Sequence, residues 1–172
     1  MAVSLPNLDP KLVVRPVRED DLPRLEWEGE HVRYRRIFRS AFDDMQAGSR
    51  LLLVAAVDDL IVGRLFIQWA SSDTRYADGA IRAYLYALRV RSNWRRHGIG
   101  TYLVNAAEDQ LRANGFTTAT IAVGKNNVSA LRLYERLGYT TFDQDPGVWY
   151  FTDDRGRLQR EEEASWIMEK HL

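Results

Sequence analysis

RRHGIGTYL, residues 95–103, places two glycines one residue apart, directly after two arginines and directly before apolar residues at helical spacing. Glycine is unfavourable inside a helix, and cations at a helix N-terminus oppose the helix dipole. A bound anion would offset both costs, because backbone N–H groups at a helix start attract phosphate and arginine forms charge-assisted contacts with it. The stretch therefore predicts a pyrophosphate-binding turn, to which the nearby Arg91 would add charge. A helix start with a solvated basic face is the alternative.

Two common phosphate motifs do not fit these residues. A Walker loop requires Gly-Lys-Ser/Thr after its spacer, and that sequence is missing here. A dinucleotide fingerprint requires a small third residue, where this chain has Leu103, and an acidic residue about 20 positions later. The chain instead reads Thr118-Ala119-Thr120 at that distance. The local chemistry thus indicates pyrophosphate without either motif.

The composition is that of a soluble globular protein. The chain has 172 residues, 24 basic and 24 acidic side chains, and no cysteine. A balanced charge argues against non-specific binding to nucleic acid or to an anionic membrane, and the lack of cysteine excludes disulfides and thiolate nucleophiles. The N-terminal stretch MAVSLPNLDPK lacks the pattern of a signal peptide, and no apolar run is long enough to span a bilayer. We expect one cytoplasmic domain over residues 1–172, with no nucleic-acid partner, no membrane partner and no metal.

The order of apolar patterns predicts an α/β (α+β) fold. Apolar periodicity indicates helices at 32–45, 99–113 and 129–137, and an acidic stretch at 19–29 marks another helix start. Strands are expected at 12–17, 51–57, 60–70, 81–90, 116–123 and from 139, and 148–154 is expected to pair with 165–172 across the turn DDRGR. This order predicts a mixed, mostly antiparallel sheet flanked by helices, with one central parallel βαβ step.

Two segments carry a family resemblance. VRSNWRRHGIGTYLVNAAE resembles the acetyl-CoA-binding motif Arg/Gln-x-x-Gly-x-Gly/Ala of the GCN5-related N-acetyltransferase (GNAT) superfamily, at Arg95, Gly98 and Gly100. VGKNNVSALRLYERLGY is similar to the second signature of that family, Asn-x-x-Ala-x-x-x-Tyr followed by Gly-Phe/Tyr. The two segments occur in the order and at the separation typical of the family. The resemblance extends over residues 84–142.

The resemblance implies a GNAT-like fold and transfer of an acetyl group from acetyl-CoA, the co-substrate, to an amine. The strand before the loop would splay from its neighbour. Its backbone at Leu88, Arg89 and Val90 would face the pantetheine, and Asn127 would reach the pantetheine or phosphate arm. Tyr134 would lie near the sulfur, where a phenol still protonated at pH 7 is a sensible donor to the leaving thiolate. The pyrophosphate would be held by the loop residues Arg95, Arg96, His97, Gly98, Ile99, Gly100 and Thr101.

Structural roles are open for several of these residues. Tyr134 shares a helical face with Ala130 and Leu137, as a core aromatic would, and Asn127 suits a helix N-cap. His97 is expected to face solvent or a phosphate. Many family members carry a Glu on the strand before the loop, and this chain has Tyr84 and Tyr86 there instead. We therefore name no general base. A water acting through backbone carbonyls is one alternative, and the candidates elsewhere in the chain, each expected at the surface, are Glu26, Glu28, Glu30, His31 and Asp73.

Three hypotheses describe the acceptor. The first is a small-molecule amine, the second is a protein N-terminus or lysine side chain, and the third is no acceptor at all, in a non-catalytic acyl-CoA sensor. The acidic run at 26–30 could attract a cationic amine, or it is a solvated helix end. A homodimer is common in similar proteins and is kept as an expectation. The aromatic residues that would line an amine pocket, or else form core, are Trp27, Tyr34, Phe38, Trp69, Tyr84 and Tyr86.

Overall fold

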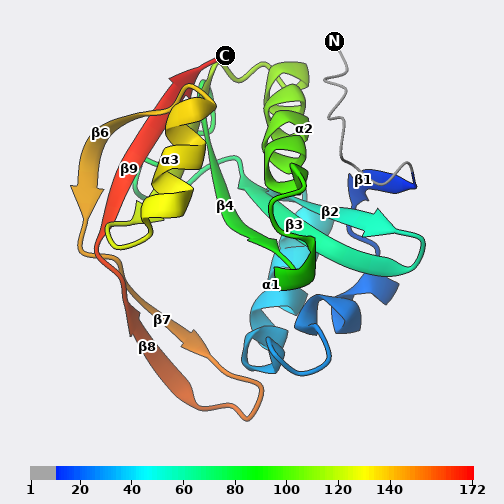
Figure 1. The fold of residues 1–172 in the computed structure, drawn as a ribbon. Coiled ribbons are helices and arrows are strands. Elements are labelled where there is room, and N and C mark those ends of the chain that lie inside the picture. Colours follow the sequence, from blue (N-terminus) through cyan, green and yellow to red (C-terminus); the bar gives the residue numbers. More distant parts are fainter. Residues whose placement is uncertain (1–10) are drawn as a thin grey trace.

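The computed structural model describes residues 11–172 as a seven-stranded sheet carrying a separate two-stranded hairpin (Figure 1). The first ten residues lie outside the described part of the chain. They belong to the N-terminal stretch MAVSLPNLDPK, which lacks the pattern of a signal peptide. The strand order in the sheet is β1-β2-β3-β4-β5-β9-β6, and only β4 and β5 run parallel. The strands are β1 (Leu12–Pro16), β2 (Arg50–Val57), β3 (Leu60–Gln68), β4 (Arg82–Val90), β5 (Thr118–Gly124), β6 (Thr140–Asp145) and β9 (Ser165–His171), with the hairpin formed by β7 (Val148–Thr152) and β8 (Leu158–Glu162).

Helices pack on both faces of the sheet. On one face, α2 (Ile99–Ala113) and α3 (Val128–Arg136) cover a core that includes Leu65 and Leu85. On the other face, the 3-10 helix η1 (Glu19–Glu26) and α1 (Arg35–Gln46) cover a core that includes Phe66. Two short 3-10 turns, η2 (Val32–Tyr34) and η3 (Ser92–Trp94), complete the elements. Strand residues alternate between the two cores, as period-two geometry requires. We call these the α2 face and the α1 face.

The mixed sheet with one parallel step confirms the predicted fold class. Two local expectations change in detail. The acidic stretch forms a 3-10 helix, in which Pro23 is tolerated, and the helix expected from residue 32 becomes α-helical only at Arg35. No helix within residues 11–172 combines the length and the apolar character needed to cross a bilayer.

The predicted pairing of 148–154 with 165–172 is wrong. β7 pairs with β8 through the tight turn after Asp153, and β9 lies between β5 and β6. The physical reason lies in burial: Ile167 and Met168 on β9 are fully buried, as in a strand with neighbours on both sides. The β8 sequence LQREE has almost no apolar residue, so hydrophobic patterning does not reveal it. In Figure 1 the hairpin extends away from the sheet.

Candidate active site

The site begins where β4 and β5 separate. β4 pairs with β5 only over Arg82–Leu85, whereas β5 continues to Gly124 alongside β9. Residues 86–90 of β4 therefore have no register partner on β5. A bulge interrupts the β3–β4 ladder at the same place, with Ala87 in a left-handed conformation at φ 57°. Leu88, Arg89 and Val90 thus lie on a strand segment whose β5-facing edge is available to a ligand.

The N-terminus of α2 lies at the end of this segment and carries no side-chain cap. Gly98 is the N-cap with φ 80°, and the first turn contains no acidic residue. A helix start without a cap leaves backbone N–H groups and the positive end of the dipole free for an anion. A Cβ on Gly100 would meet only the Leu133 side chain, at an ordinary 3.7 Å. Nothing in the described chain itself therefore requires glycine at position 100.

The cationic residues of the loop divide into two groups. Arg95, Arg96 and His97 are exposed in front of α2, and the Arg95 Nε donates to the Val90 carbonyl oxygen at 3.1 Å. Arg91, although expected to add charge to this loop, is directed elsewhere. Its guanidinium donates to the Ile61 carbonyl oxygen and to Glu28, both at 2.7 Å. Arg95 and Arg96 therefore supply the positive charge of the loop. Ile99 is buried beneath the loop, and Thr101 is half-buried.

The second signature segment forms the start and the middle of α3. The Asn127 side chain accepts a hydrogen bond from the Ala130 N–H at 3.2 Å, so it caps the helix. Tyr134 is 7% exposed and lies edge-on to Tyr139, with ring centres 6.2 Å apart. Burial raises the pKa of Tyr134 to about 12, although the nearby Arg89 opposes the rise. The Tyr134 phenol therefore keeps its proton at neutral pH.

On the α1 face, a row of tyrosines follows β4. Tyr84 stacks on Tyr86 with ring centres 5.4 Å apart, and its ring is tilted against that of Tyr76 with centres 4.8 Å apart. Burial raises the pKa of Tyr84, and the Arg50 guanidinium donates a short hydrogen bond to the Tyr86 hydroxyl. These tyrosines occupy the strand on which a Glu was sought. Of the other aromatics, Trp27 and Phe38 are buried, Tyr34 is half-buried, and Trp69 packs on Phe116 against the α2 face.

Every carboxylate considered as a general base lies beside a cation or a histidine. Glu28 pairs with Arg91, whose hydrogen bond lowers the pKa of Glu28. Glu30 lies 3.7 Å from the His31 Nε2. Glu26 pairs with Arg35 at 2.8 Å, and Asp73 pairs with Arg75 at 2.7 Å.

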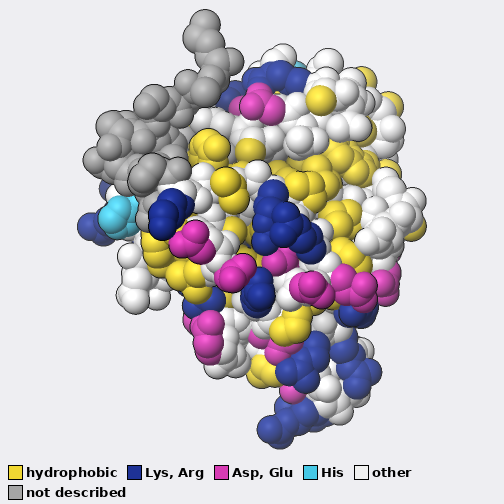
Figure 2. Space-filling view, turned by 90° about the vertical axis from the view of Figure 1, so that its right-hand side faces the viewer, with side chains coloured by type: hydrophobic (Ala, Val, Ile, Leu, Met, Phe, Trp, Pro, Cys, Tyr) yellow, Lys and Arg dark blue, Asp and Glu magenta, His cyan; other side chains and the backbone are white. Residues whose placement is uncertain are grey.

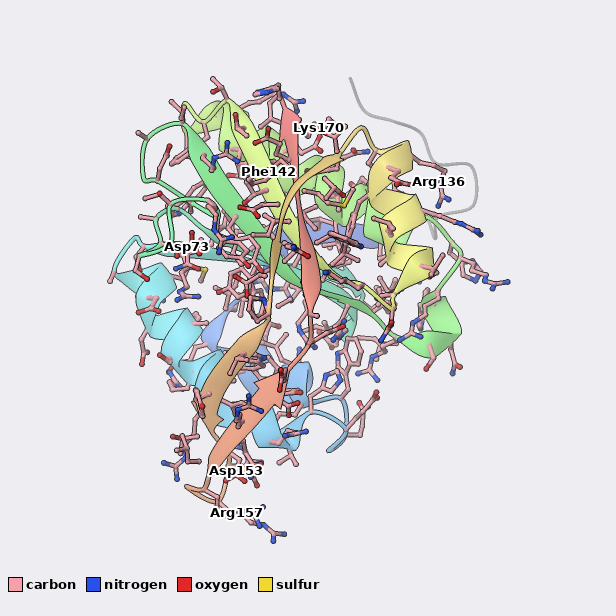
Figure 3. The ribbon with its side chains drawn as sticks, turned by 90° about the vertical axis from the view of Figure 1, so that its left-hand side faces the viewer. Asp73, Arg136, Phe142, Asp153, Arg157 and Lys170 are labelled. Atoms are coloured by element: carbon pink, nitrogen blue, oxygen red, sulfur yellow. The ribbon has the colours of Figure 1, made fainter. Side chains whose placement is uncertain are left out.

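Arg75 forms a cluster that sequence reasoning missed. Besides Asp73, which is labelled in Figure 3, it binds Asp143 at 3.1 Å and Asp145 at 3.0 Å, joining the 69–81 loop to β6. Asp145 also lies beside Tyr76 and raises the pKa of that phenol, after the larger effect of burial. The excess of carboxylates near the tyrosine row favours a cationic ligand. Within residues 11–172, no three His, Cys, Asp or Glu side chains are arranged so that they could hold a metal ion.

Comparison with known proteins identifies the family. The model of the acetyltransferase (GNAT) family matches residues 15–139, which is most of the chain. The chain therefore belongs to this family, and the resemblance based on Arg95, Gly98 and Gly100 is confirmed.

Two curated relatives match over short stretches. Mycothiol acetyltransferase of Streptosporangium roseum is 42% identical over 48 residues, which is 28% of this chain and 14% of that protein. Acetyl transferase GW6a of Oryza sativa subsp. japonica is 44% identical over 61 residues, or 35% of this chain and 15% of that protein. The chain thus spans only a small part of the length of the curated relatives that it matches.

Solved structures match over nearly the whole chain. The ribosomal-protein-S18-alanine N-acetyltransferase from Escherichia coli is 20% identical with a TM-score of 0.68, covering 94% of each chain. Arabidopsis thaliana Naa50, in complex with the bisubstrate analogue CoA-Ac-MVNAL, is 22% identical with a TM-score of 0.68, covering 94% of this chain and 99% of that one. At these identities the likeness establishes the fold.

Proposed function

We propose that this chain transfers an acetyl group from acetyl-CoA to the primary amine of a small molecule, by direct attack in a ternary complex. One observation carries the proposal. The gap between β4 and β5 lies beside the uncapped start of α2, with the buried phenol of Tyr134 close to Arg89 of the separated segment. Backbone hydrogen-bonding groups, an anion-binding turn and a proton donor are thus gathered along one path.

Each part of this path suits one part of acetyl-CoA. The exposed edge of β4 at Leu88, Arg89 and Val90 would pair with the amide groups of the pantetheine. The first turn of α2, from Gly98 to Thr101, would hold the pyrophosphate with Arg95, Arg96 and His97 around it. Asn127, besides capping α3, is exposed at the opposite side of this path and would reach the pantetheine or phosphate arm.

The chemistry begins with an amine that is mostly protonated. A primary alkyl amine has a pKa of about 10.4, so only about one molecule in 2,500 is neutral at pH 7, a cost of about 4.6 kcal/mol. The neutral nitrogen forms a bond to the thioester carbon, and the carbon–sulfur bond then breaks. Backbone N–H groups of the β4 bulge would stabilise the oxyanion, and Tyr134 would give its proton to the leaving sulfur. The proton that the nitrogen sheds on becoming an amide would then return to the Tyr134 phenolate through water.

No carboxylate is assigned the role of general base. Glu26, Glu28 and Asp73 are held in ion pairs, and Glu30 is exposed beside His31. In this proposal the amine loses its proton to water, and the tyrosine row favours the approach of the cation through its aromatic faces.

The hairpin supports a small acceptor. Arg33 of η2 pairs with Glu161 of β8 at 2.7 Å, and Tyr34 packs on Phe151 of β7 at 5.3 Å between ring centres. In this proposal the junction would bound the acceptor side of the site, and such a boundary would suit a compact molecule better than an extended chain. Transfer to a protein N-terminus or lysine is the second candidate, favoured by the similarity in fold to the S18-alanine enzyme and to Naa50.

The test is an acceptor screen. The purified chain is incubated with acetyl-CoA and polyamines, amino acids, aminoglycosides, arylamines or short peptides, and thiol release and product mass are recorded. We expect release with one class of small amine. Release with peptides alone would support the second candidate. Binding of acetyl-CoA without transfer to any acceptor would indicate a non-catalytic acyl-CoA sensor.

A further inference from the structure

Arg64 on β3 is a buried cation that has no carboxylate partner within residues 11–172. It is 4% exposed, and its guanidinium lies over the rings of Trp27 at 5.2 Å and Phe38 at 5.0 Å. One of its terminal nitrogens lies 3.0 Å from the Nδ1 of His31. Its Nε is buried and has no hydrogen-bond partner among the residues that the structure describes, and the same is true of the indole N–H of Trp27 beside it. Buried donors normally find acceptors, so two orphans in one cluster suggest an acceptor supplied from outside.

A second arginine faces the first. Arg64 is directly opposite Arg89 in the β3–β4 ladder. Both point to the α1 face, because Leu65 beside Arg64 and Leu88 beside Arg89 pack against the α2 face. Like charges directly opposite on a sheet destabilise it. Neither arginine forms an ion pair with any residue in 11–172.

No carboxylate within residues 11–172 neutralises this pair, of which Arg64 is buried and Arg89 is exposed. Burial, and then Arg89, lower the pKa of Arg64 to about 9, so Arg64 is still charged at neutral pH. Burial and Arg64 also lower the pKa of His31, which is therefore neutral, and its Nδ1 accepts a hydrogen bond from the Arg64 guanidinium. The nearest carboxylate, Glu30, is mostly exposed on the other side of His31. Aromatic faces explain how a guanidinium plane is buried, and they leave its in-plane Nε donor unpaired among the described residues.

We propose that Arg64 and Arg89 bind a carboxylate of the acceptor, so that the substrate class is an amine carrying a carboxylate, such as an amino acid. The inference rests on the proposed acetyl transfer, because that function places the acceptor beside the separated segment of β4. Arg89 directly follows Leu88 on the separated segment of β4 and points to the face opposite α2 and α3, from which an acceptor would approach. A carboxylate would offset the repulsion between the two arginines and accept from the unpaired donors, and a guanidinium fork suits it.

Matched acceptors and three variants test this. The acceptors are α-amino acids, ω-amino acids and the amide of each, which keeps the amine and removes the carboxylate. The variants are Arg89→Gln, Arg64→Lys, which keeps the charge and loses the fork, and Arg39→Gln as a control on the outer side of α1. We expect the wild type to prefer acid over amide by at least about 10-fold in kcat/KM. Arg89→Gln and Arg64→Lys should remove most of that preference, through KM, and Arg39→Gln should preserve it.

Equal rates with acid and amide, or an unchanged preference in both Arg89→Gln and Arg64→Lys, would overturn the proposal. Comparison of α- with ω-amino acids distinguishes a carboxylate near the amine from one farther away. If no acceptor reacts, acetyl transfer to these amines fails, and calorimetry with N-acetylated amino acids and CoA decides the carboxylate site separately. Binding of the acid but not its amide, lost in Arg89→Gln, would support the site; no binding would refute it.

Discussion

The hydroxyl of Tyr139 donates to the carboxylate of Glu108 at 2.9 Å, so the last residues of the two signature segments meet in the core. Lys170 of β9 donates to both oxygens of the same carboxylate at 3.0 Å. Glu108 is 2% exposed and links α2 to β9 and to Tyr139, which lies between α3 and β6. The carboxylate is therefore a structural link between the two segments that we propose hold acetyl-CoA.

We expect Glu108→Gln to lower the free energy of unfolding by about 3 kcal/mol, because Lys170 would lose its close carboxylate partner, the only one that it has within residues 11–172. Tyr139→Phe removes one hydrogen bond to a charged group and should cost about 1.5 kcal/mol. Urea unfolding measures both values. The matched surface variant Arg39→Ala breaks an exposed pair with Glu19 and should cost less than about 1 kcal/mol. Equal losses of unfolding free energy in all three variants would show that Glu108 contributes no more than an exposed ion pair and does not link the two segments.

Tyr134→Phe should lower kcat by about 100-fold, because the leaving sulfur would lose its proton donor. The KM for acetyl-CoA should change little. Since the pKa of Tyr134 is raised to about 12, the phenol is protonated throughout the neutral range. The loss should therefore be the same at every pH from about 6 to about 9.

Tyr139→Phe is the matched control for Tyr134, since its ring lies 6.2 Å from that of Tyr134 and its hydroxyl has a structural partner. This variant should keep kcat at temperatures where it is folded. Full turnover in Tyr134→Phe would exclude Tyr134 as the proton donor. A pH-dependent loss would indicate that another titrating group replaces it.

Gly100→Val should abolish binding of acetyl-CoA while the chain remains folded. The added side chain would obstruct backbone approach to the pyrophosphate, and within the protein its Cβ would meet only Leu133 at an ordinary 3.7 Å. Calorimetric titration with CoA gives the affinity, and circular dichroism checks the fold. The contrasting variant is Gly63→Val, whose Cβ would lie 3.1 Å from Leu103 and 3.2 Å from the Arg89 carbonyl oxygen. Gly63→Val should therefore lower the free energy of unfolding, whereas Gly100→Val should not. Wild-type affinity in Gly100→Val would refute the loop assignment.

Local signals account for what could be predicted from the sequence. The turn before α2 depends on residues within a few positions of Gly98, and apolar periodicity revealed α2, α3 and the central strands. The Arg75 cluster joins residues 68 and 70 positions apart, and the Arg64–Arg89 pair depends on a strand register broken by the Ala87 bulge. No single-sequence pattern carries that information.

Charge patterning shows the same limit. Figure 2 shows basic and acidic side chains interspersed over the face that it presents, consistent with the balanced composition. Composition alone does not reveal that Arg64 is buried without a carboxylate. Similarly, LQREE gave no strand signal, and only its position directly after the turn at Asp153 pairs it with β7.

The tip of the hairpin contains a carboxylate held by its own turn, and Figure 3 shows Asp153 and Arg157 there. Asp153 accepts from the backbone N–H groups of Arg157 at 2.8 Å and Arg155 at 3.0 Å, and from the side chains of Arg157 and Gln159 at 3.0 Å. These bonds, the Arg157 backbone first, lower the pKa of Asp153 from 3.8 to about 2. Because the folded pKa is depressed, the stabilisation is complete above the ordinary pKa and is lost as the pH falls through about 2. We expect the Arg155 and Arg157 amide resonances to titrate in NMR spectra with a midpoint near 2, and Asp153→Asn to abolish that titration. A midpoint near 3.8 would mean that the turn does not hold the carboxylate.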